Sequence, residues 1–304
     1  MTKVLYIAGY GRSGSTVLSI ILGNHREVIN VGELSLLLND LANHDRQCSC
    51  RVPYRECDFW KDLILDQPPA PELTQLVRKV ERLSFLPRLL LGMVTNKDRL
   101  IYRVYQEKLF KYIVSRSGSS IVVDASKSAR GTVGRFLALI RLAGEDVYVL
   151  HLVRNGLAAM ESTVITGSNW AIEGYTEPRK WPVLRTPLGW VSANAWASGI
   201  GLLLGPQRYM LLLFEDFLAD PATALRKVGQ FLDLDTEDLI KRIDRNDYFQ
   251  VGHIVGGNRV RLQGDIRLER GSKHRYGDRL KPNQRLIFTL LGGWLNHWYG
   301  YGGG

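Results

Sequence analysis

Cysteine is scarce in this chain: it accounts for 3 of 304 residues, too few for the disulfide framework that holds many small secreted domains together. No segment stays apolar for long enough to cross a membrane as a helix. The first apolar run, Val4 to Ala8, stops at Gly9, which makes it too short for the apolar core of a signal peptide. We therefore expect a buried first strand, no transmembrane segment and a cytoplasmic protein.

Acidic residues are outnumbered, with 30 Asp and Glu against 40 Lys and Arg, and the formal net charge is +10. Such an excess favours anionic partners: a phosphorylated cofactor, an acidic glycan, nucleic acid or a lipid headgroup. The basic run from Arg259 to Arg285 raises the possibility of nucleic-acid binding, but Tyr276 is its only aromatic residue. We interpret this run as a solvated or cofactor-facing surface, and we expect no nucleic-acid partner.

Short apolar runs alternate with helical patterns along the chain. Strands are expected at Val4–Ala8, Val28–Val31, Ser120–Asp124, Val147–Val153 and Arg208–Phe214. This alternation predicts an α/β fold of three layers, with a central parallel sheet between helices and a P-loop-like nucleotide-binding core. We expect a single domain over residues 1–304, with an insertion of two helices at about 72–116. In such sheets, ligands bind beyond the carboxyl ends of the strands.

A glycine-rich turn follows the first expected strand and precedes a helical pattern. The turn reads Gly9-Tyr10-Gly11-Arg12-Ser13-Gly14-Ser15-Thr16. A strand, a turn and a helix in this order present backbone N–H groups and a positive dipole to a phosphate. The spacing agrees with the nucleoside-triphosphatase loop except at Ser15, which stands in place of the lysine, and the cation has moved to Arg12. The turn therefore suits a 5′-phosphate with one further anionic group better than ATP. A P-loop kinase or NTPase remains the alternative, with Asp124 as its candidate magnesium ligand.

Cationic side chains follow two further strands. Arg154 comes directly after Val147–Val153, and Ser162 lies two turns into the helix that follows. Lys127 comes shortly after the Ser120–Asp124 strand. Because the carboxyl ends of parallel strands meet at one edge of a sheet, we expect Lys127 and Arg154 to converge on the glycine-rich turn. Arg154 and Ser162 could bind a second phosphate, separate from the one at the turn.

Together these residues resemble sulfotransferases that use 3′-phosphoadenosine-5′-phosphosulfate (PAPS). The turn is similar to their 5′-phosphosulfate loop, and Arg154 with Ser162 is similar to their 3′-phosphate motif. The stretch from His25 to Glu33 resembles the segment of tyrosylprotein sulfotransferases that carries the catalytic glutamate, and Lys127 matches the family's lysine near the bridging oxygen. The segment His253–Arg261 and the final aromatic residues resemble the bacterial branch.

The resemblance implies transfer of a sulfuryl group from PAPS to a hydroxyl acceptor, with no metal required. Glu33 is the implied general base, with Arg12 and Lys127 as the other catalytic residues. His25 and His253 are alternative bases. The implied cofactor contacts are Gly11, Arg12, Ser13, Gly14, Ser15, Thr16, Arg154, Ser162, Gly257, Asn258 and Arg261. The acceptor stays open among a sugar, a lipid, a polyketide, a phenol and a peptide tyrosine, and so does the oligomeric state.

The cysteines are clustered at positions 48, 50 and 57. Zinc usually has four ligands, and His44 is the only histidine nearby in the sequence. Cys48 or Cys50 could instead form a disulfide with Cys57 in an oxidising compartment. We expect reduced thiols packed beneath Phe59 and Trp60, with no bound metal.

Overall fold

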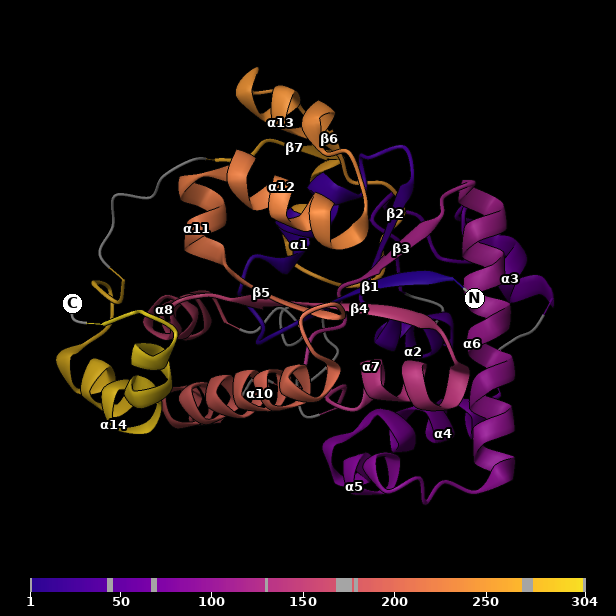
Figure 1. The fold of residues 1–304 in the computed structure, drawn as a ribbon, viewed down its shortest axis with the longest axis horizontal. Coiled ribbons are helices and arrows are strands. Elements are labelled where there is room, and N and C mark those ends of the chain that lie inside the picture. Colours follow the sequence, from indigo (N-terminus) through magenta and orange to yellow (C-terminus); the bar gives the residue numbers. More distant parts are fainter. Residues whose placement is uncertain are drawn as a thin grey trace.

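The computed structural model describes residues 2–42, 46–66, 70–128, 131–167, 177, 180–269 and 276–302. Its centre is a parallel five-stranded sheet (Figure 1). The strands are β1 (Lys3–Ala8), β2 (Val28–Gly32), β3 (Ile121–Asp124), β4 (Asp146–Val153) and β5 (Tyr209–Leu213), in the spatial order β2-β3-β1-β4-β5. A separate antiparallel pair joins β6 (Phe249–Gln250) and β7 (Asp265–Ile266). The predicted parallel sheet and all five of its strands are confirmed.

Helices cover both faces of the sheet. They are α1 (Ser15–Leu22), α2 (Leu37–Ala42), α3 (Lys61–Asp66), α4 (Pro71–Glu81), α5 (Leu86–Leu90), α6 (Asn96–Ser117), α7 (Arg135–Ala138), α8 (Gly156–Thr166), α10 (Pro182–Leu204), α11 (Phe214–Ala219), α12 (Pro221–Leu232), α13 (Glu237–Asp244) and α14 (Pro282–Trp298). Shorter helical turns are η1 (Leu34–Leu36), η2 (Leu83–Phe85), η3 (Leu139–Ala143) and η4 (Arg259–Gln263). No helix of the described residues is long and apolar enough to cross a membrane.

The continuous apolar run in β1 is explained by burial on both faces. Val4, Tyr6 and Ala8 point into a core that also contains residues of α2, α4, α6 and α7. Leu5 and Ile7 point into the opposite core, with residues of α1, α12 and α13. Figure 1 shows α12 and α13 on one side of the sheet and α4 and α7 on the other. A strand whose successive side chains all enter a core must be apolar throughout, which is typical of parallel sheets.

The insertion at about 72–116 contains three helices rather than the predicted two. Arg82 has an extended backbone (φ −77°, ψ 154°), which ends α4. Pro87 lies in the first turn of α5, where its missing N–H costs no helical hydrogen bond. The long helix α6 buries Tyr102 and Phe110 in the same core as one face of β1.

The expected acceptor loop from Gly167 to Pro187 is partly helical. Residues 168–176, 178 and 179 lie outside the described residues, but α10 begins at Pro182, where a proline is tolerated because the N–H it lacks has no helical partner. The expectation of a loop is therefore wrong from Pro182 onward. Helix α10 packs with α8 and α14 around Trp190 and forms a third core.

The strand order places a crossover point beside the central strand. From β1 the chain passes through α1 to β2 at one edge of the sheet, whereas from β4 it passes through α8 and α10 to β5 at the other edge. The connections that leave the adjacent strands β1 and β4 thus diverge at their carboxyl ends. Open α/β sheets bind ligands in the crevice that forms at such a point.

Candidate functional site

The glycine-rich turn leads from β1 into the first turn of α1. Gly14 precedes α1 with a left-handed backbone (φ 86°), and a Cβ there would lie 2.1 Å from the ring of Phe214. Only glycine avoids both the backbone strain and this overlap. The Ser13 hydroxyl donates to the Tyr10 carbonyl at 2.7 Å, so it stabilises the turn itself. The first N–H groups of α1 have no partners within the helix and are available to an anion.

Arg12 is held beside the turn by its neighbours. Its backbone is left-handed (φ 69°), which is uncommon for a residue other than glycine, and its guanidinium donates to the carbonyl of Gly167 at the end of α8. Burial lowers the pKa of Arg12, and the nearby charge of Arg154 lowers it further. A site that places two arginines so close together is suited to a ligand with more than one negative charge.

Arg154 directly follows β4 and Ser162 lies in α8, as the sequence predicted. The guanidinium of Arg154 donates to the backbone carbonyl of Arg12 at 2.9 Å and lies over the ring of Phe214 at 5.5 Å. Asn155 caps α8 by accepting a hydrogen bond from the N–H of Leu157 at 2.9 Å. The cap starts α8 directly after Arg154, so Ser162 lines the same cavity of the structure as Arg12 and Arg154.

Glu33 and Lys127 form an ion pair across the ends of β2 and β3. These strands are neighbours in the sheet, and the N–H of Ala125 donates to the Gly32 carbonyl at 2.7 Å just beyond their last paired residues. The Glu33 side chain is 2% exposed and that of Lys127 is 13% exposed. The structure therefore brings together the implied base and the implied lysine, and Lys127 also lines the cavity.

The segment that contains Asn258 lies against the start of α1. The N–H of Asn258 donates to the Thr16 hydroxyl at 3.1 Å. Gly257 has a φ of 100°, and a Cβ there would lie 3.2 Å from the same hydroxyl oxygen, so the close approach favours glycine. Arg261 is buried in η4, which follows Asn258.

One cavity of about 180 Å³ joins these segments. Its lining includes Arg12, the turn from Gly14 to Thr16, Lys127, Arg154 with Ser162, and Asn258. A second cavity of about 410 Å³ shares Arg154, Ser162 and Phe214 with the first and extends to Tyr276 and Arg279. Of the implied cofactor contacts, Gly11, Ser13, Gly257 and Arg261 lie outside the described lining of either cavity. Phe214 lines both cavities but could not be identified from the sequence, because it is an apolar residue after β5 and belongs to none of the motifs.

Asp124, the candidate magnesium ligand of the kinase alternative, instead forms a buried ion pair with Arg135. Its carboxylate accepts from Arg135 Nε at 2.7 Å and from the N–H of Ser126 at 3.0 Å, and Arg135 also pairs with Glu81. Asp124, Arg135 and Glu81 are all buried. An aspartate enclosed in this ionic cluster is not open to a nucleotide-bound cation, so the kinase alternative loses its nominated ligand.

The two alternative histidine bases lie elsewhere. His25 is at the amino-terminal end of β2, where its Nε2 lies 2.9 Å from the Asp235 carbonyl, at the opposite edge of the sheet from Glu33. His253 Nδ1 lies 3.2 Å from Cys57 Sγ and 3.9 Å from Cys48 Sγ.

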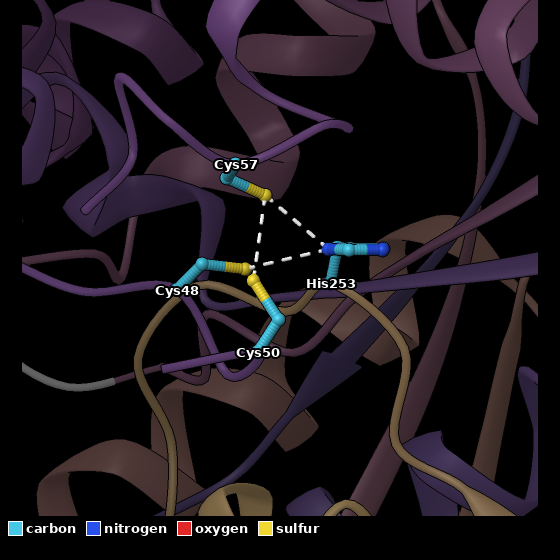
Figure 2. Close-up of side chains that lie close together, drawn as sticks. All are labelled: Cys48, Cys50, Cys57 and His253. Atoms are coloured by element: carbon cyan, nitrogen blue, oxygen red, sulfur yellow. Dashed lines mark hydrogen bonds between the residues drawn. The ribbon is translucent and has the colours of Figure 1, made fainter. Parts of the chain in front are cut away.

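The three cysteines and His253 form one compact group (Figure 2). One potential ligand atom from each of the four residues lies within 4.8 Å of the others. His44, the histidine considered from the sequence, lies outside the described residues. Because 196 positions separate Cys57 from His253, spacing along the chain carried no signal for this grouping.

This chain is similar to known proteins in sequence and in fold. A family model described as the sulfotransferase family matches residues 5–238. The sulfotransferase domain of the Synechococcus PCC 7002 olefin synthase is 19% identical, with a TM-score of 0.52 over 100% of this chain and 96% of that chain. The sulfotransferase domain of the curacin biosynthetic pathway is 17% identical, with a TM-score of 0.51 over 96% of this chain and 98% of that chain. These two structures share the fold, and no curated protein sequence matched.

Proposed function

Because this chain belongs to the sulfotransferase family, we propose that it transfers a sulfuryl group from PAPS to a hydroxyl-bearing acceptor. The observation that carries the proposal is the convergence of three separate segments on one cavity at the carboxyl edge of the sheet. These segments are the turn before α1, Arg154 with Ser162, and Lys127.

The donor set fits a nucleotide with two anionic ends. The N–H groups at the start of α1 and the Arg12 guanidinium would hold the 5′-phosphosulfate. Arg154 and Ser162, which line both cavities, would hold the 3′-phosphate. The larger cavity beyond Phe214 offers space for the rest of the nucleotide.

The chemistry then depends on the pair formed by Glu33 and Lys127. Sulfuryl transfer resembles phosphoryl transfer, in which charge builds on the leaving oxygen, so positioning and electrostatic stabilisation dominate. Lys127 reaches the cavity and would neutralise charge on the leaving oxygen. Glu33, oriented by its ion pair with Lys127, would accept the proton of the acceptor hydroxyl. The acceptor itself is a hydroxyl compound of unassigned class.

Nucleotide selectivity tests this proposal. Isothermal titration of the purified protein should show that adenosine-3′,5′-bisphosphate binds far more tightly than AMP, and also more tightly than ATP with magnesium. Each charge-assisted contact that AMP cannot make removes about 1.5–3 kcal/mol of binding free energy. Equal affinity for AMP and the bisphosphate would refute the donor assignment. Preference for ATP that depends on magnesium would support a kinase instead.

A further inference from the structure

We propose that Cys48, Cys50, Cys57 and His253 form a structural zinc site that holds the His253–Arg261 segment against the catalytic edge of the sheet. The site includes four ligands from two segments far apart in the sequence, and Figure 2 shows their sulfur and nitrogen atoms converging. The catalytic chemistry proposed above makes no use of this metal.

The distances between the four side chains agree with a zinc tetrahedron. Bonds of about 2.3 Å to sulfur and about 2.0–2.1 Å to nitrogen separate two sulfurs by about 3.8 Å, and a sulfur from a nitrogen by about 3.6 Å. Cys50 Sγ lies 3.7 Å from Cys57 Sγ. His253 Nδ1 lies 3.2 Å from Cys57 Sγ and 3.9 Å from Cys48 Sγ, on either side of the tetrahedral value. A disulfide requires about 2.05 Å between sulfurs, so the described geometry is that of a ligand set.

The backbone around the cysteines supports the same arrangement. Cys48 and Cys50 lie on a tight turn in which the Cys48 N–H donates to the Val52 carbonyl at 3.0 Å, and Arg51 has a left-handed backbone (φ 68°). Cys57 begins a second turn, in which its carbonyl accepts from the N–H of Trp60 at 3.0 Å. The two turns place three sulfurs at one point.

Two of the four side chains lie in the protein interior. Cys48, Cys57 and Trp60 are fully buried, whereas Cys50 is exposed. The ring of Phe59 stacks on that of His253 at 5.7 Å, which orients the imidazole.

The donor set indicates which metal binds. Three thiolates and one imidazole are a typical ligand set of structural zinc sites, and hard cations such as magnesium prefer oxygen ligands. All four positions of the tetrahedron come from this chain, so no position stays open for water or substrate. Such closed sites stabilise folded structure rather than activate a ligand.

The segment that His253 would anchor continues into the proposed catalytic site. Ser49, between two of the cysteines, donates to the Gly252 carbonyl at 2.6 Å and accepts from the N–H of Ile254 at 2.8 Å. Two residues after His253, the Val255 carbonyl accepts a hydrogen bond from the N–H of Glu33 at 2.6 Å. The N–H of Asn258 then reaches Thr16. The positioning role of the metal rests on the proposed function, whereas the metal site itself does not.

Metal analysis of protein purified without a histidine tag tests the site directly. We expect inductively coupled plasma mass spectrometry to find about one zinc ion per chain. His253→Ala and Cys57→Ser should each lose nearly all of it, whereas His44→Ala and His25→Ala should keep it. Removal of a ligand weakens zinc binding at least as much as loss of a hydrogen-bond partner of a ligand, which lowers the metal affinity about 10–100-fold. Zinc lost in His44→Ala and kept in His253→Ala would overturn the ligand assignment.

Cobalt substitution covers the case in which the variants do not fold. Wild-type protein refolded with Co²⁺ in place of zinc should show the thiolate-to-cobalt charge-transfer band and the intense visible bands of a tetrahedral site. Wild-type protein that contains no zinc, gives no such bands and exposes all three thiols to a thiol reagent would overturn the proposal. A disulfide between Cys50 and Cys57 in protein purified without reductant would also overturn it.

A separate measurement tests the role of the metal. Stripping zinc with a chelator should weaken the binding of adenosine-3′,5′-bisphosphate, because the segment that contacts Thr16 loses its anchor. Zinc that can be removed with no change in this affinity would overturn the positioning role. The zinc content of the wild type does not depend on nucleotide binding, so failure of the metal site and failure of the sulfotransferase assignment are distinguishable.

Discussion

Arg154→Ala removes one guanidinium from the point where the two cavities meet. In the native structure this group donates to the Arg12 carbonyl at 2.9 Å and lies over Phe214. If it also binds the 3′-phosphate, its loss removes a charge-assisted contact of about 1.5–3 kcal/mol. At about 1.4 kcal/mol for each factor of ten, adenosine-3′,5′-bisphosphate should bind roughly tenfold to a hundredfold more weakly.

Arg154 also supports the turn, so a loss of affinity alone would not identify a phosphate contact. Comparison with AMP separates the two roles, because AMP lacks the 3′-phosphate. Support of the turn through the Arg12 carbonyl affects both nucleotides equally, since both present a 5′-phosphate to the turn. A direct contact affects the bisphosphate alone. We therefore expect Arg154→Ala to reduce the preference for the bisphosphate over AMP nearly to unity.

Isothermal titration of both nucleotides at one fixed ionic strength measures this preference, since salt screens the charges involved. Arg208→Ala is the matched control, because Arg208 pairs with Asp146 at the opposite edge of the sheet and its removal changes the net charge by the same amount. The control should keep the wild-type preference. If Arg154→Ala weakened both nucleotides by the same factor, the 3′-phosphate assignment would be refuted.

Two further predictions concern the base and a buried histidine. Glu33→Gln should keep nucleotide affinity within a few-fold of the wild type and lower turnover about 10²–10⁴-fold, measured with a radiolabelled donor and an acceptor found by screening. The control is Glu27→Gln, at the other end of β2, which should keep the wild-type turnover. Wild-type turnover in Glu33→Gln would exclude this carboxylate as the base. Burial lowers the pKa of His151 to about 4, so between about pH 6.5 and 4 the unfolded chain binds a proton that the folded chain does not, and stability falls as the pH is lowered. From pH 7 to pH 5 this difference in proton binding lowers the free energy of unfolding by about 2 kcal/mol. Urea unfolding should show that this fall is smaller by that amount in His151→Gln than in the wild type. A fall equal to that of the wild type would contradict the lowered pKa of His151.

The sheet could be predicted from the sequence because the information for it is local. Each strand of a sheet buried on both faces must be apolar throughout, as β1 is from Val4 to Ala8, and the turn residues mark where it ends. The same logic placed Lys127 and Arg154 at the sheet edge, since parallel strands end there together. The ion pair of Lys127 with Glu33 follows from the adjacency of β2 and β3, which the alternation of strands and helices does not specify.

Other features could not be predicted because they depend on residues far apart in the sequence. The expected loop before Pro187 is partly helix α10, which packs in a core with α8 and α14 that no local pattern indicates. Asp124 looked available at a strand end, yet Arg135 and Glu81 enclose it once α4 and α7 cover that face.

Local residue order thus determined the parallel α/β architecture, the glycine-rich turn and the charges at the sheet edge, since backbone geometry and burial of each short segment depend on its own residues. The tertiary structure decided which distant side chains meet. His253 follows Cys57 by nearly two hundred positions, and it is brought to the three thiols by the pairing of Val255 with the end of β2 and by the hydrogen bonds of Ser49 to the backbone on either side of His253. A metal-ligand group is defined by distances of a few ångströms between side chains, and such distances between separate segments arise only when the chain has folded.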